Sequence, residues 1–459
     1  MVTVPAVVIA APSSGSGKTT LATGLIGALR RAGHTVAPFK VGPDFIDPGY
    51  HGVAAGRPGR NLDPLLVGEQ RIGPLYQYGS AGADIAVIEG VMGLFDGRIE
   101  ADRRGPARGS TAQVAGLLGA PVVMVIDGAG HSQSLAALLH GFATFDAATR
   151  ICGVVLNRVG SARHEEVLRQ ACEVVGLPVL GAIPRDAALS VPSRHLGLIT
   201  AAEHGTAAAA AVDAMAALVA RHVDIEAVVG LAAARVGGKP WTPRDEVGEP
   251  VTDEPVVALA AGRAFTFGYA EHRELLLAAG AAIAEFDPLS DSLPPDTAAI
   301  VVPGGFPEQY PADLAANVLL RTQIRVFAQY GPVHAECAGL TYLMSELDGH
   351  AMCGVLPGKA YFTTRLTLGY RDAVAVADSP LCVAGSRLFG HEFHRTTVDF
   401  DGHHSPAWQF RVGDRTVSDG AVVRGVHAAY LHTHPAGQPD FMRRFVRHAT
   451  IGTSTRTER

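Results

Sequence analysis

The sequence predicts an α/β protein with two parallel-sheet domains in one chain. Short Val- and Ile-rich runs alternate with helix-like segments up to about residue 222, and such unbroken apolar runs are typical of strands buried on both faces of a parallel sheet. A Pro- and Gly-rich stretch follows, and a second α/β pattern begins at residue 256. The 459 residues are 47% hydrophobic and 18% charged, which provides apolar material for two cores and excludes a disordered or fibrous chain.

The expected elements follow this alternation in order. In the first domain we predict strands at residues 4–11, 35–40, 85–89, 121–127 and 151–157, and helices at 19–32, 165–175 and 205–222. In the second domain we predict strands at 256–261, 282–286 and 298–302, with a helix at 269–279. Strands that alternate with helices form βαβ units, so the first domain should be a doubly wound sheet. The chain then divides into a domain at 1–222, a linker at 223–255 and a domain at 256–459.

Charge and cysteine content limit the expected surroundings of the protein. The formal net charge is −6 and the isoelectric point is near 6.3, so no nucleic acid partner is expected. No apolar run reaches the ~18 residues that span a bilayer, and no basic region precedes the apolar N-terminal segment. We interpret that segment as a first strand and expect no membrane association. Five cysteines without a CxxC pair suit a reducing compartment and predict a cytoplasmic protein.

A phosphate-binding loop follows the first predicted strand. Residues 11–20 read Ala-Pro-Ser-Ser-Gly-Ser-Gly-Lys-Thr-Thr and lead into a helix, which is the context that such a loop requires. Backbone N–H groups would cradle phosphate, Lys18 would reach the terminal phosphates, and Thr19 would ligate Mg²⁺. The strict pattern has glycine where this chain has Pro12, so the loop is a variant. The predicted ATP-binding residues are Ser14, Gly15, Ser16, Gly17, Lys18, Thr19 and Thr20, together with Asn157, for which a role in turn formation is equally open.

Acidic side chains are predicted at the carboxyl ends of two neighbouring strands. Asp44 and Asp47 follow Lys40 at the end of the second strand, where ligands of open α/β sheets bind. Lys40, Asp44 and Asp47 are therefore assigned to substrate binding and phosphoryl transfer, against the plainer interpretation of an acidic turn. Glu89 ends a buried strand like the acidic residue of a Walker B element. The predicted Mg²⁺ ligands are Thr19, Asp44 and Glu89.

A cysteine nucleophile is predicted in the second domain. Cys337 lies in the small-residue turn Glu-Cys-Ala-Gly between a strand and a helix, where a tight turn exposes sulfur at a helix N-terminus. Gly304 and Gly305, after an earlier strand, offer consecutive backbone N–H groups for an oxyanion. Ala338 completes the predicted oxyanion-binding set. The other four cysteines are interpreted as small buried apolar residues.

The general base is expected far along the chain, in the segment Tyr-Leu-His-Thr-His at 430–434. Alternation places both histidines of this segment on one face of a strand end, and we favour His432 with His434 in reserve. The cluster His391-Glu-Phe-His394 spaces its histidines by three, without a helical pattern. We therefore expect a structural or substrate-side role for it and no zinc.

These motifs resemble the cobyrinic acid / hydrogenobyrinic acid a,c-diamide synthases of vitamin B12 biosynthesis. The motifs that carry the resemblance are Lys-x-Gly-Pro-Asp-Phe-x-Asp-Pro at 40–48, Pro-Gly-Gly-Phe-Pro-Glu at 303–308 and Glu-Cys-Ala-Gly-Leu-x-Tyr-Leu at 336–343. The resemblance covers nearly the whole chain. It implies a dethiobiotin-synthetase-like phosphate-loop domain followed by a class I glutamine amidotransferase domain.

The resemblance also implies the chemistry. Cys337 would attack the side-chain amide of glutamine and release ammonia, while ATP with Mg²⁺ would phosphorylate a carboxylate of a corrinoid substrate. Ammonia would then displace the phosphate, first at the c and then at the a acetate group. Class I glutaminases usually have a glutamate two residues beyond the base, where this chain has His434, so a Cys–His dyad is implied.

Alternative functions remain open at this point. A cobyric acid synthase would amidate other corrinoid carboxylates, but the motif at 43–48 argues against it, and a dethiobiotin-synthetase-like ligase would leave the second domain unexplained. A MinD/ParA-type switch ATPase needs a further lysine in the loop, whereas positions 12–16 carry Pro, Ser, Ser, Gly and Ser. The sequence does not distinguish a cobalt-containing from a cobalt-free corrin, and it leaves a homodimer open.

Overall fold

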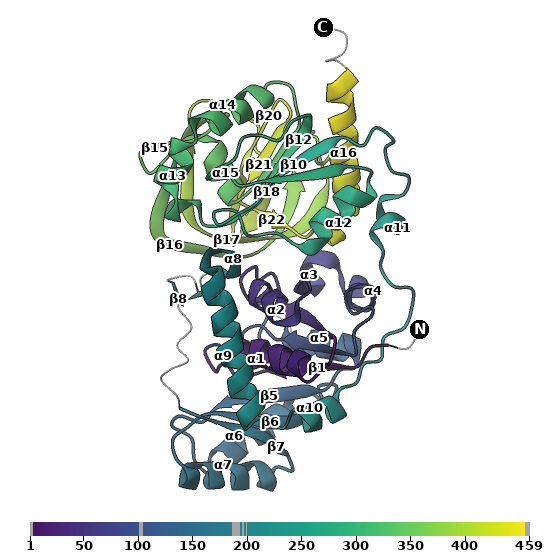
Figure 1. The fold of residues 1–459 in the computed structure, drawn as a ribbon, viewed down its shortest axis with the longest axis vertical. Coiled ribbons are helices and arrows are strands. Elements are labelled where there is room, and N and C mark those ends of the chain that lie inside the picture. The colour runs from purple at the N-terminus through teal and green to yellow at the C-terminus, as the bar shows by residue number, and fades with distance from the viewer. Residues whose placement is uncertain (1–2, 101–103, 186–192, 195–196, 199, 455–459) are drawn as a thin grey trace. The chain divides into compact units, whose positions relative to one another are not determined.

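The computed structural model describes residues 3–100, 104–185, 193–194, 197–198 and 200–454 (Figure 1). The chain forms two compact units, unit 1 at Met1–Trp241 and unit 2 at Thr242–Arg459. Their division falls inside the stretch predicted as a linker. Residues 223–241 pack on unit 1, since the N–H groups of Asp224, Ala233 and Trp241 donate to carbonyls of Leu180, Ala6 and Pro74.

Unit 1 contains a seven-stranded parallel sheet with the order β3-β2-β4-β1-β5-β6-β7. The strands are β1 (Ala6–Ala10), β2 (Val36–Val41), β3 (Arg60–Leu62), β4 (Ile85–Glu89), β5 (Val122–Asp127), β6 (Ile151–Val159) and β7 (Val179–Pro184). The chain leaves β1 toward β2 but leaves β4 in the opposite direction, toward β5. This reversal makes a topological switch point at the carboxyl ends of β1 and β4, where ligands of such sheets bind.

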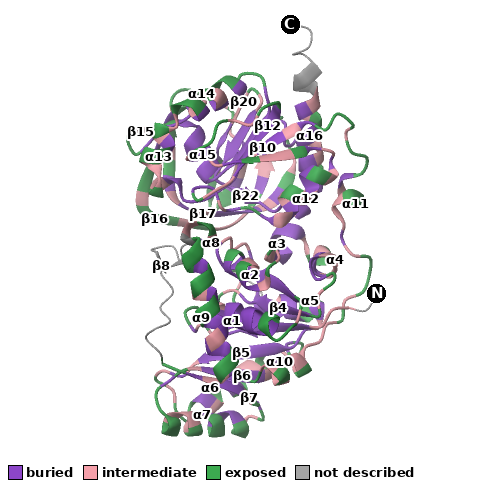
Figure 2. Ribbon diagram, in the orientation of Figure 1, coloured by how far each residue is buried: buried purple, intermediate pink, exposed green. Residues whose placement is uncertain are grey.

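Helices surround the sheet of unit 1, and Figure 2 shows buried strands against helices with exposed outer faces. The helices are α1 (Lys18–Arg31), α2 (Asp47–Ala55), α3 (Pro64–Val67), α4 (Glu69–Gly79), α5 (Thr111–Leu118), α6 (Leu135–Phe145), α7 (Ala162–Val174), α8 (Ala201–His204), α9 (Thr206–His222) and α10 (Ile225–Leu231). A short strand pair, β8 (Ser193–Arg194) and β9 (Gly197–Leu198), stands apart. Helix α1 packs along α9, so the helix that follows the predicted phosphate loop is held by a long helix of the same unit.

Unit 2 contains two sheets. The first has the order β11-β10-β12-β13-β21-β20 and is parallel except at its β20–β21 edge. Its strands are β10 (Val256–Ala260), β11 (Ala282–Phe286), β12 (Thr297–Val302), β13 (Val333–Glu336), β20 (Ala421–Val423) and β21 (Val426–Ala429). The second sheet has the order β15-β14-β16-β17-β22, with β18 paired to β16 and β19 paired to β18. Its strands are β14 (Met344–Leu347), β15 (His350–Ala351), β16 (Leu356–Ala375), β17 (Arg387–Phe400), β18 (Trp408–Val412), β19 (Arg415–Asp419) and β22 (His432–Thr433).

The helices of unit 2 are α11 (Pro243–Val247), α12 (Ala270–Ala278), α13 (Pro311–Ala316), α14 (Val318–Phe327), α15 (Ala338–Leu343) and α16 (Pro439–Ser454), with 3-10 turns at Pro307–Gln309 and Pro435–Gly437. Helix α15 follows directly on β13 and packs against β12 and β21. Its residues are buried throughout, so the strand–turn–helix junction at residue 337 is anchored in the core.

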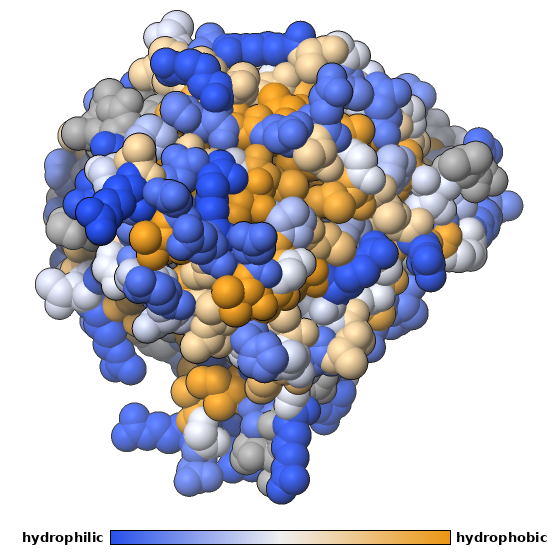
Figure 3. Space-filling view, turned by 90° about the horizontal axis from the view of Figure 1, so that it is seen from below, coloured by the Kyte–Doolittle hydropathy of each residue, from blue (hydrophilic) through white to orange (hydrophobic). Residues whose placement is uncertain are grey.

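The predicted α/β class and the doubly wound first domain are confirmed. The long β16–β17 hairpin was not expected, because its solvent-facing and polar residues interrupt the apolar pattern from which strands were predicted. No described helix is long and apolar enough to cross a bilayer. Seen from below, the surface mixes hydrophilic side chains with an apolar area near the centre of the view (Figure 3).

The contact between α1 and α9 gives a test of the fold. A methyl group on Gly24 would lie 2.5 Å from Val219 Cγ2 and 2.6 Å from the Met215 carbonyl oxygen, and a backbone carbonyl cannot move aside. We expect Gly24→Ala to lower the free energy of unfolding of unit 1 by about 1–3 kcal/mol. Gly141→Ala in α6 is the matched control, because nothing lies within 4 Å of its added methyl group; it should raise stability by about 0.5–1 kcal/mol.

Unfolding of unit 1 can be followed by the fluorescence of Trp241, which packs edge-on against Tyr78. A Trp408→Phe background removes the second of the two tryptophans, which belongs to unit 2. A Gly24→Ala protein as stable as its parent would contradict the close packing of α1 on α9.

Candidate active site

The predicted phosphate loop lies between β1 and α1 in unit 1. Gly17, the residue before α1, has φ of 98°, and a Cβ there would lie 2.3 Å from Asn157 Nδ2. Asn157 Nδ2 in turn donates to the Ser16 carbonyl over 2.9 Å. Asn157 therefore supports the loop from β6, and only glycine fits between them.

Lys18 is bound to the loop itself. Its Nζ donates to the Ser13 carbonyl over 3.0 Å and to the Met92 carbonyl over 2.5 Å. Burial, reinforced by the positive charge of Lys40, lowers the pKa of Lys18 to about 8. An anion that binds beside this ammonium would stabilise its charged form, as expected for a phosphate-binding lysine.

A buried charge cluster lies at the carboxyl ends of β2 and β4. Lys40 Nζ lies 2.6 Å from Asp47 Oδ2 and 2.8 Å from Glu89 Oε1. The Thr19 hydroxyl donates to Glu89 Oε1 over 2.6 Å, and His51 Nε2 lies 2.7 Å from Glu89 Oε2. The structure thus brings together Thr19, Lys40, Asp47 and Glu89 from four separate segments, and it adds His51, which the sequence analysis missed.

Opposing effects set the charges of this cluster. Burial raises the pKa of Asp47 to about 7, with further contributions from Asp44 and Glu89. Burial also disfavours a charged Glu89, but Lys40 and His51 outweigh it and hold the pKa of Glu89 below its usual value. The same two carboxylates outweigh the burial of Lys40 and raise its pKa. The cluster is therefore stable only as a set, because each charge depends on its neighbours.

Asp44 has a different environment. Its Oδ1 accepts from the backbone N–H groups of Ile46 and Asp47 over 2.7 and 2.8 Å, which turns the chain into α2. Asn61, another residue that the sequence analysis missed, donates from Nδ2 to the carbonyls of Gly42 and Asp44. The Thr19 hydroxyl lies 3.4 Å from Asp47 Oδ2. The role of Asp44 as a metal ligand stays a prediction.

The donor atoms of this cluster fit a hard divalent cation. Thr19, Asp47 and Glu89 present a hydroxyl and carboxylate oxygens to one another, and Mg²⁺ prefers oxygen ligands. No three His, Cys, Asp or Glu side chains among the described residues form a metal-binding group by themselves. Phosphoryl-transfer sites usually complete the shell of Mg²⁺ with phosphate oxygens and water, so few protein ligands are needed.

In unit 2, Cys337 lies at the turn between β13 and α15. Its φ of 51° and ψ of −103° are strained for a residue with a side chain. Its N–H donates to the Ala429 carbonyl over 2.7 Å, and a methyl group on Gly339 would lie 2.1 Å from the Val302 carbonyl. This close packing fixes the turn, which is the geometry of a nucleophile elbow.

Cys337 is buried, with 4% of the residue exposed. Burial raises its pKa above the usual value, Glu308 adds to this, and a hydrogen bond from the Ala338 backbone opposes it. A thiol held neutral needs a base to become a nucleophile. The Ala338 N–H lies beside the sulfur, and its role as an oxyanion donor stays a prediction.

The predicted oxyanion loop lies against the favoured base. A Cβ on Gly304 would lie 2.4 Å from His432 Cε1, and one on Gly305 would lie 2.1 Å from the Ala264 carbonyl. The Gly304 carbonyl accepts from the Phe267 N–H over 3.0 Å. Both glycines are required by close packing, and the packing at Gly304 holds the loop against His432.

His432 and His434 have different surroundings. His432 is fully buried on β22, opposite His391 of β17, and its Nδ1 lies 3.7 Å from Glu336 Oε2. His434 stacks on Tyr269 at 4.2 Å, and its Nδ1 accepts from the Ala436 N–H over 3.3 Å. His434 thus caps the 3-10 turn that follows, while His432 lies beside the elbow.

The His391–His394 segment belongs to β17. Burial and the neighbouring His432 lower the pKa of His391 to about 3, so it is neutral near pH 7. His394 stacks on Tyr430 at 3.8 Å and lies 3.5 Å from Glu392. These contacts tie β17 to the segment that carries His432.

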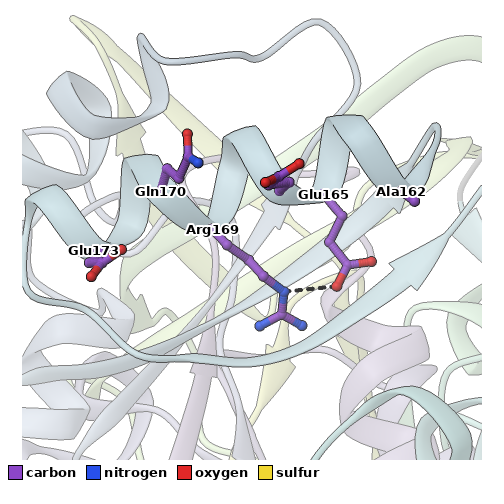
Figure 4. A pocket seen from close by; sticks show the side chains of 6 residues that line it. Ala162, Glu165, Arg169, Gln170 and Glu173 are labelled. Carbon is purple, nitrogen blue, oxygen red and sulfur yellow. Dashed lines mark hydrogen bonds and ion pairs between the residues drawn. The ribbon is translucent and has the colours of Figure 1, made fainter.

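Two cavities lie away from these residues. One of about 380 Å³ follows a single face of α7, where Arg169 Nε donates to Glu165 Oε1 over 2.8 Å (Figure 4). The other, of about 580 Å³, lies between residues 381–387 and α16 in unit 2. Neither is lined by a residue predicted to bind substrate or to take part in catalysis.

Two family descriptions match the chain, one in each unit. Residues 7–199 match the CobQ/CobB/MinD/ParA nucleotide binding domain, and residues 256–439 match the CobB/CobQ-like glutamine amidotransferase domain. The phosphate loop lies in the first match and the cysteine elbow in the second. Fold and site thus define a nucleotide-binding domain joined to a glutamine amidotransferase domain.

Relatives that match along nearly the whole chain identify the family within this class of protein. The chain is 65% identical to the hydrogenobyrinate a,c-diamide synthase of Mycobacterium tuberculosis H37Rv, covering 98% of this chain and 99% of that protein. It is 53% identical to the enzyme of that name from Streptomyces coelicolor, over 96% and 97%. It is 40% identical to the cobyrinate a,c-diamide synthase of Syntrophotalea carbinolica, over 96% and 98%. The chain therefore belongs to the a,c-diamide synthase family, as its motifs predicted.

The two histidines can be separated by mutation. We expect His432→Asn to lower glutamine hydrolysis by about 10²–10⁴-fold, because the thiol loses its base. His434→Asn should keep activity within about tenfold of the parent, since its stacking and capping contacts lie outside proton transfer. Glutamate release, measured with circular dichroism as a check on folding, distinguishes them. The reverse ranking would assign the base to His434.

Proposed function

We propose that this protein is a hydrogenobyrinate a,c-diamide synthase, which amidates the a and c acetate carboxylates of hydrogenobyrinic acid with ATP and glutamine. The observation that carries this proposal is 65% identity along 98% of the chain to a relative of that name. A relative named for cobyrinate is 40% identical, so the cobalt-containing substrate is the second candidate. Cobalamin biosynthesis is the pathway that the family implies.

Ammonia would be made in unit 2. The Cys337 sulfur attacks the carbonyl carbon of the glutamine side-chain amide, and His432 takes the thiol proton. Backbone N–H groups of Gly304, Gly305 and Ala338 stabilise the oxyanion. His432 returns the proton to the departing nitrogen, so ammonia leaves and a glutamyl thioester remains. Water then hydrolyses the thioester and frees glutamate.

Ligation would take place in unit 1. The loop of Ser14 to Thr20 binds ATP, and Lys18 contacts its terminal phosphates. A corrin carboxylate near Lys40, Asp44 and Asp47 attacks the γ-phosphorus, giving an acyl phosphate and ADP. Ammonia attacks the acyl carbon, phosphate leaves, and the excess proton passes to solvent.

Thr19, Asp44 and Glu89 would hold Mg²⁺, with Asp47 in reach of Thr19. The ion, when bound, supplies positive charge against the phosphate oxygens. Each carboxylate needs its own ATP, since a carboxylate is a poor acyl donor without a phosphoryl leaving group. Two rounds give the diamide.

We place the reaction in the cytoplasm, where five free cysteines suit a reducing environment. A homodimer remains a prediction that light scattering after size-exclusion chromatography can test. The substrate is a small corrinoid, and we propose no nucleic acid or membrane partner.

The function is tested by supplying ATP, Mg²⁺ and glutamine with hydrogenobyrinic acid or cobyrinic acid in parallel. Mass spectrometry should show two successive replacements of a hydroxyl by an amino group, then no further change, with hydrogenobyrinic acid preferred. A preference for cobyrinic acid would select the second candidate. Four amidations, or none with ATP hydrolysis intact, would overturn the proposal.

The first variant concerns the nucleophile. Cys337→Ser should abolish glutamine-dependent synthesis, because a serine hydroxyl is a poor nucleophile in a site shaped for a thiol. Synthesis from free ammonium should persist, since the ligation residues are unchanged. Cys152→Ser, at a half-buried cysteine of unit 1, is the matched control and should keep both activities. Glutamine-dependent synthesis by Cys337→Ser would remove Cys337 from the mechanism.

The second pair concerns the ligation site. Glu89→Gln and Asp44→Asn should each lower ammonium-dependent synthesis by about 100-fold or more, because each removes a negative charge aimed at the metal and phosphates. Glutamine hydrolysis should remain comparatively intact. Asp84→Asn is the control, because Asp84 is an exposed residue whose side chain accepts from the Thr35 N–H over 2.7 Å. Full ligation by Glu89→Gln would contradict the assignment, and unfolding is monitored in parallel.

A further inference from the structure

The Glu336 carboxylate lies beside His432, the favoured base, although the two residues are far apart in the sequence. Class I glutaminases usually carry a glutamate two residues beyond the base, and this chain has His434 there. In the structure, Glu336 Oε2 lies 3.7 Å from His432 Nδ1. Glu336 is the last residue of β13 and directly precedes Cys337. One strand end therefore carries both the nucleophile and an acidic group that faces the base.

The Glu336 side chain is held in a fixed direction. Its Oε1 accepts from the Thr433 N–H over 3.1 Å and from the Thr433 hydroxyl over 2.7 Å. His334 Nε2 also lies 3.5 Å from Oε1. Since Thr433 follows His432 on β22, the bonds that orient the carboxylate also fix the residue next to the base. The second oxygen is left directed at His432.

The carboxylate is charged where it lies. Burial favours its neutral form, but His334 and His432 outweigh burial and hold the pKa of Glu336 well below its usual value. Glu336 is 8% exposed and His432 is fully buried. An interaction between charges is stronger in such surroundings than in water.

We propose that Glu336 is the positioning residue of the glutaminase, and that it does for His432 what a glutamate two residues downstream does in other class I enzymes. The proposal rests on the proposed roles of Cys337 and His432. A carboxylate facing Nδ1 keeps the proton on that nitrogen, so Nε2 carries the lone pair that accepts the thiol proton. The 3.7 Å between these two atoms is longer than a hydrogen bond, and catalytic contacts of this kind tighten in the substrate complex.

The proton balance follows from this arrangement. When the thiol proton passes to His432 Nε2, the ring carries two N–H groups and a positive charge. Glu336 stabilises that charge and remains ionised itself. When the amide nitrogen departs, the proton leaves Nε2 with it, and the ring returns to its neutral Nδ1–H form. No other acid or base is consumed.

Glu336→Gln is the decisive variant. Its amide oxygen can still accept from Thr433, while its NH₂ group would face His432 Nδ1 and favour the opposite tautomer. We expect kcat for glutamine hydrolysis to fall by about 10²–10⁴-fold, with KM for glutamine changed by less than about threefold. Synthesis from free ammonium should stay near the parent level. Glu336→Asp keeps the charge on a shorter side chain and should recover part of the lost kcat.

Glu271→Gln is the matched control. Glu271 is also a buried carboxylate beside a histidine, with its Oε2 4.0 Å from His434 Nε2. A loss of buried charge alone would affect both variants, whereas a role in proton transfer affects only Glu336→Gln. If Glu336→Gln does not fold, as judged by lost ammonium-dependent synthesis and circular dichroism, Glu336→Asp decides. It should show lowered kcat with KM little changed.

The outcomes separate this proposal from the proposed function. Parent-like kcat in folded Glu336→Gln, or in Glu336→Asp if the former does not fold, would overturn the positioning role. The proposed function would stand if Cys337→Ser had lost glutamine-dependent synthesis. Glutamine-dependent synthesis by Cys337→Ser would instead overturn the proposed function itself. Equal losses of kcat in Glu271→Gln and Glu336→Gln would overturn the positioning role and would show that Glu336 contributes to structure alone.

Discussion

The contact between Lys40 and Glu89 is the interaction on which the first unit's site depends. The two residues pair directly across β2 and β4, so sheet register alone places an ammonium beside a carboxylate. Taking one such ion out of water costs several kcal/mol, and neither could remain charged there alone. Asp47 and His51 complete the compensation. The position of α2, which carries both, is thereby coupled to the charge state of two strands.

The second unit uses strand ends in the same way, with a different chemical result. Parallel pairing of β13 with β21 sets Glu336 opposite Ala429, and the chain from there runs two residues farther to Leu431 before β22 begins at His432. Thr433 closes this path by bonding back to Glu336. Two features thus fix the position of His432. One is the strand pairing that sets where β22 begins, and the other is the Glu336 carboxylate, which is hydrogen-bonded to Thr433. Geometry that catalysis needs is obtained from backbone pairing, which is rigid.

Local patterns predicted what local physics determines. Short stretches of sequence were enough to predict the buried strands of unit 1, the loop at 11–20 and the turn at Cys337. The structure has a strand, a loop or a strand–turn–helix junction at each of these places. The sequence did not predict the roles of His51 and Asn61 or the contact of Glu336 with His432. Sheet order brings these residues together, and no periodicity in the sequence links them. Thr433 and Glu336 are 97 positions apart. The hairpin of β16 and β17 was not predicted for another reason. Many of its residues face solvent, so the apolar pattern that marks a strand is weak there.

The position of Glu336 constrains how the thiol can react. The carboxylate is adjacent to Cys337 and raises the pKa of the thiol, in addition to burial and Glu308, because two neighbouring buried anions repel each other. The same carboxylate would stabilise the imidazolium that forms when His432 takes the thiol proton. If the resting enzyme held a thiolate–imidazolium pair, Glu336 would destabilise the thiolate and stabilise the imidazolium. Proton removal as the sulfur attacks avoids this conflict. The negative charge then moves from sulfur toward the proposed oxyanion donors, the backbone N–H groups of Gly304 and Gly305, while the imidazolium forms. A neutral resting thiol and a charged neighbour are thus consistent parts of one general-base mechanism.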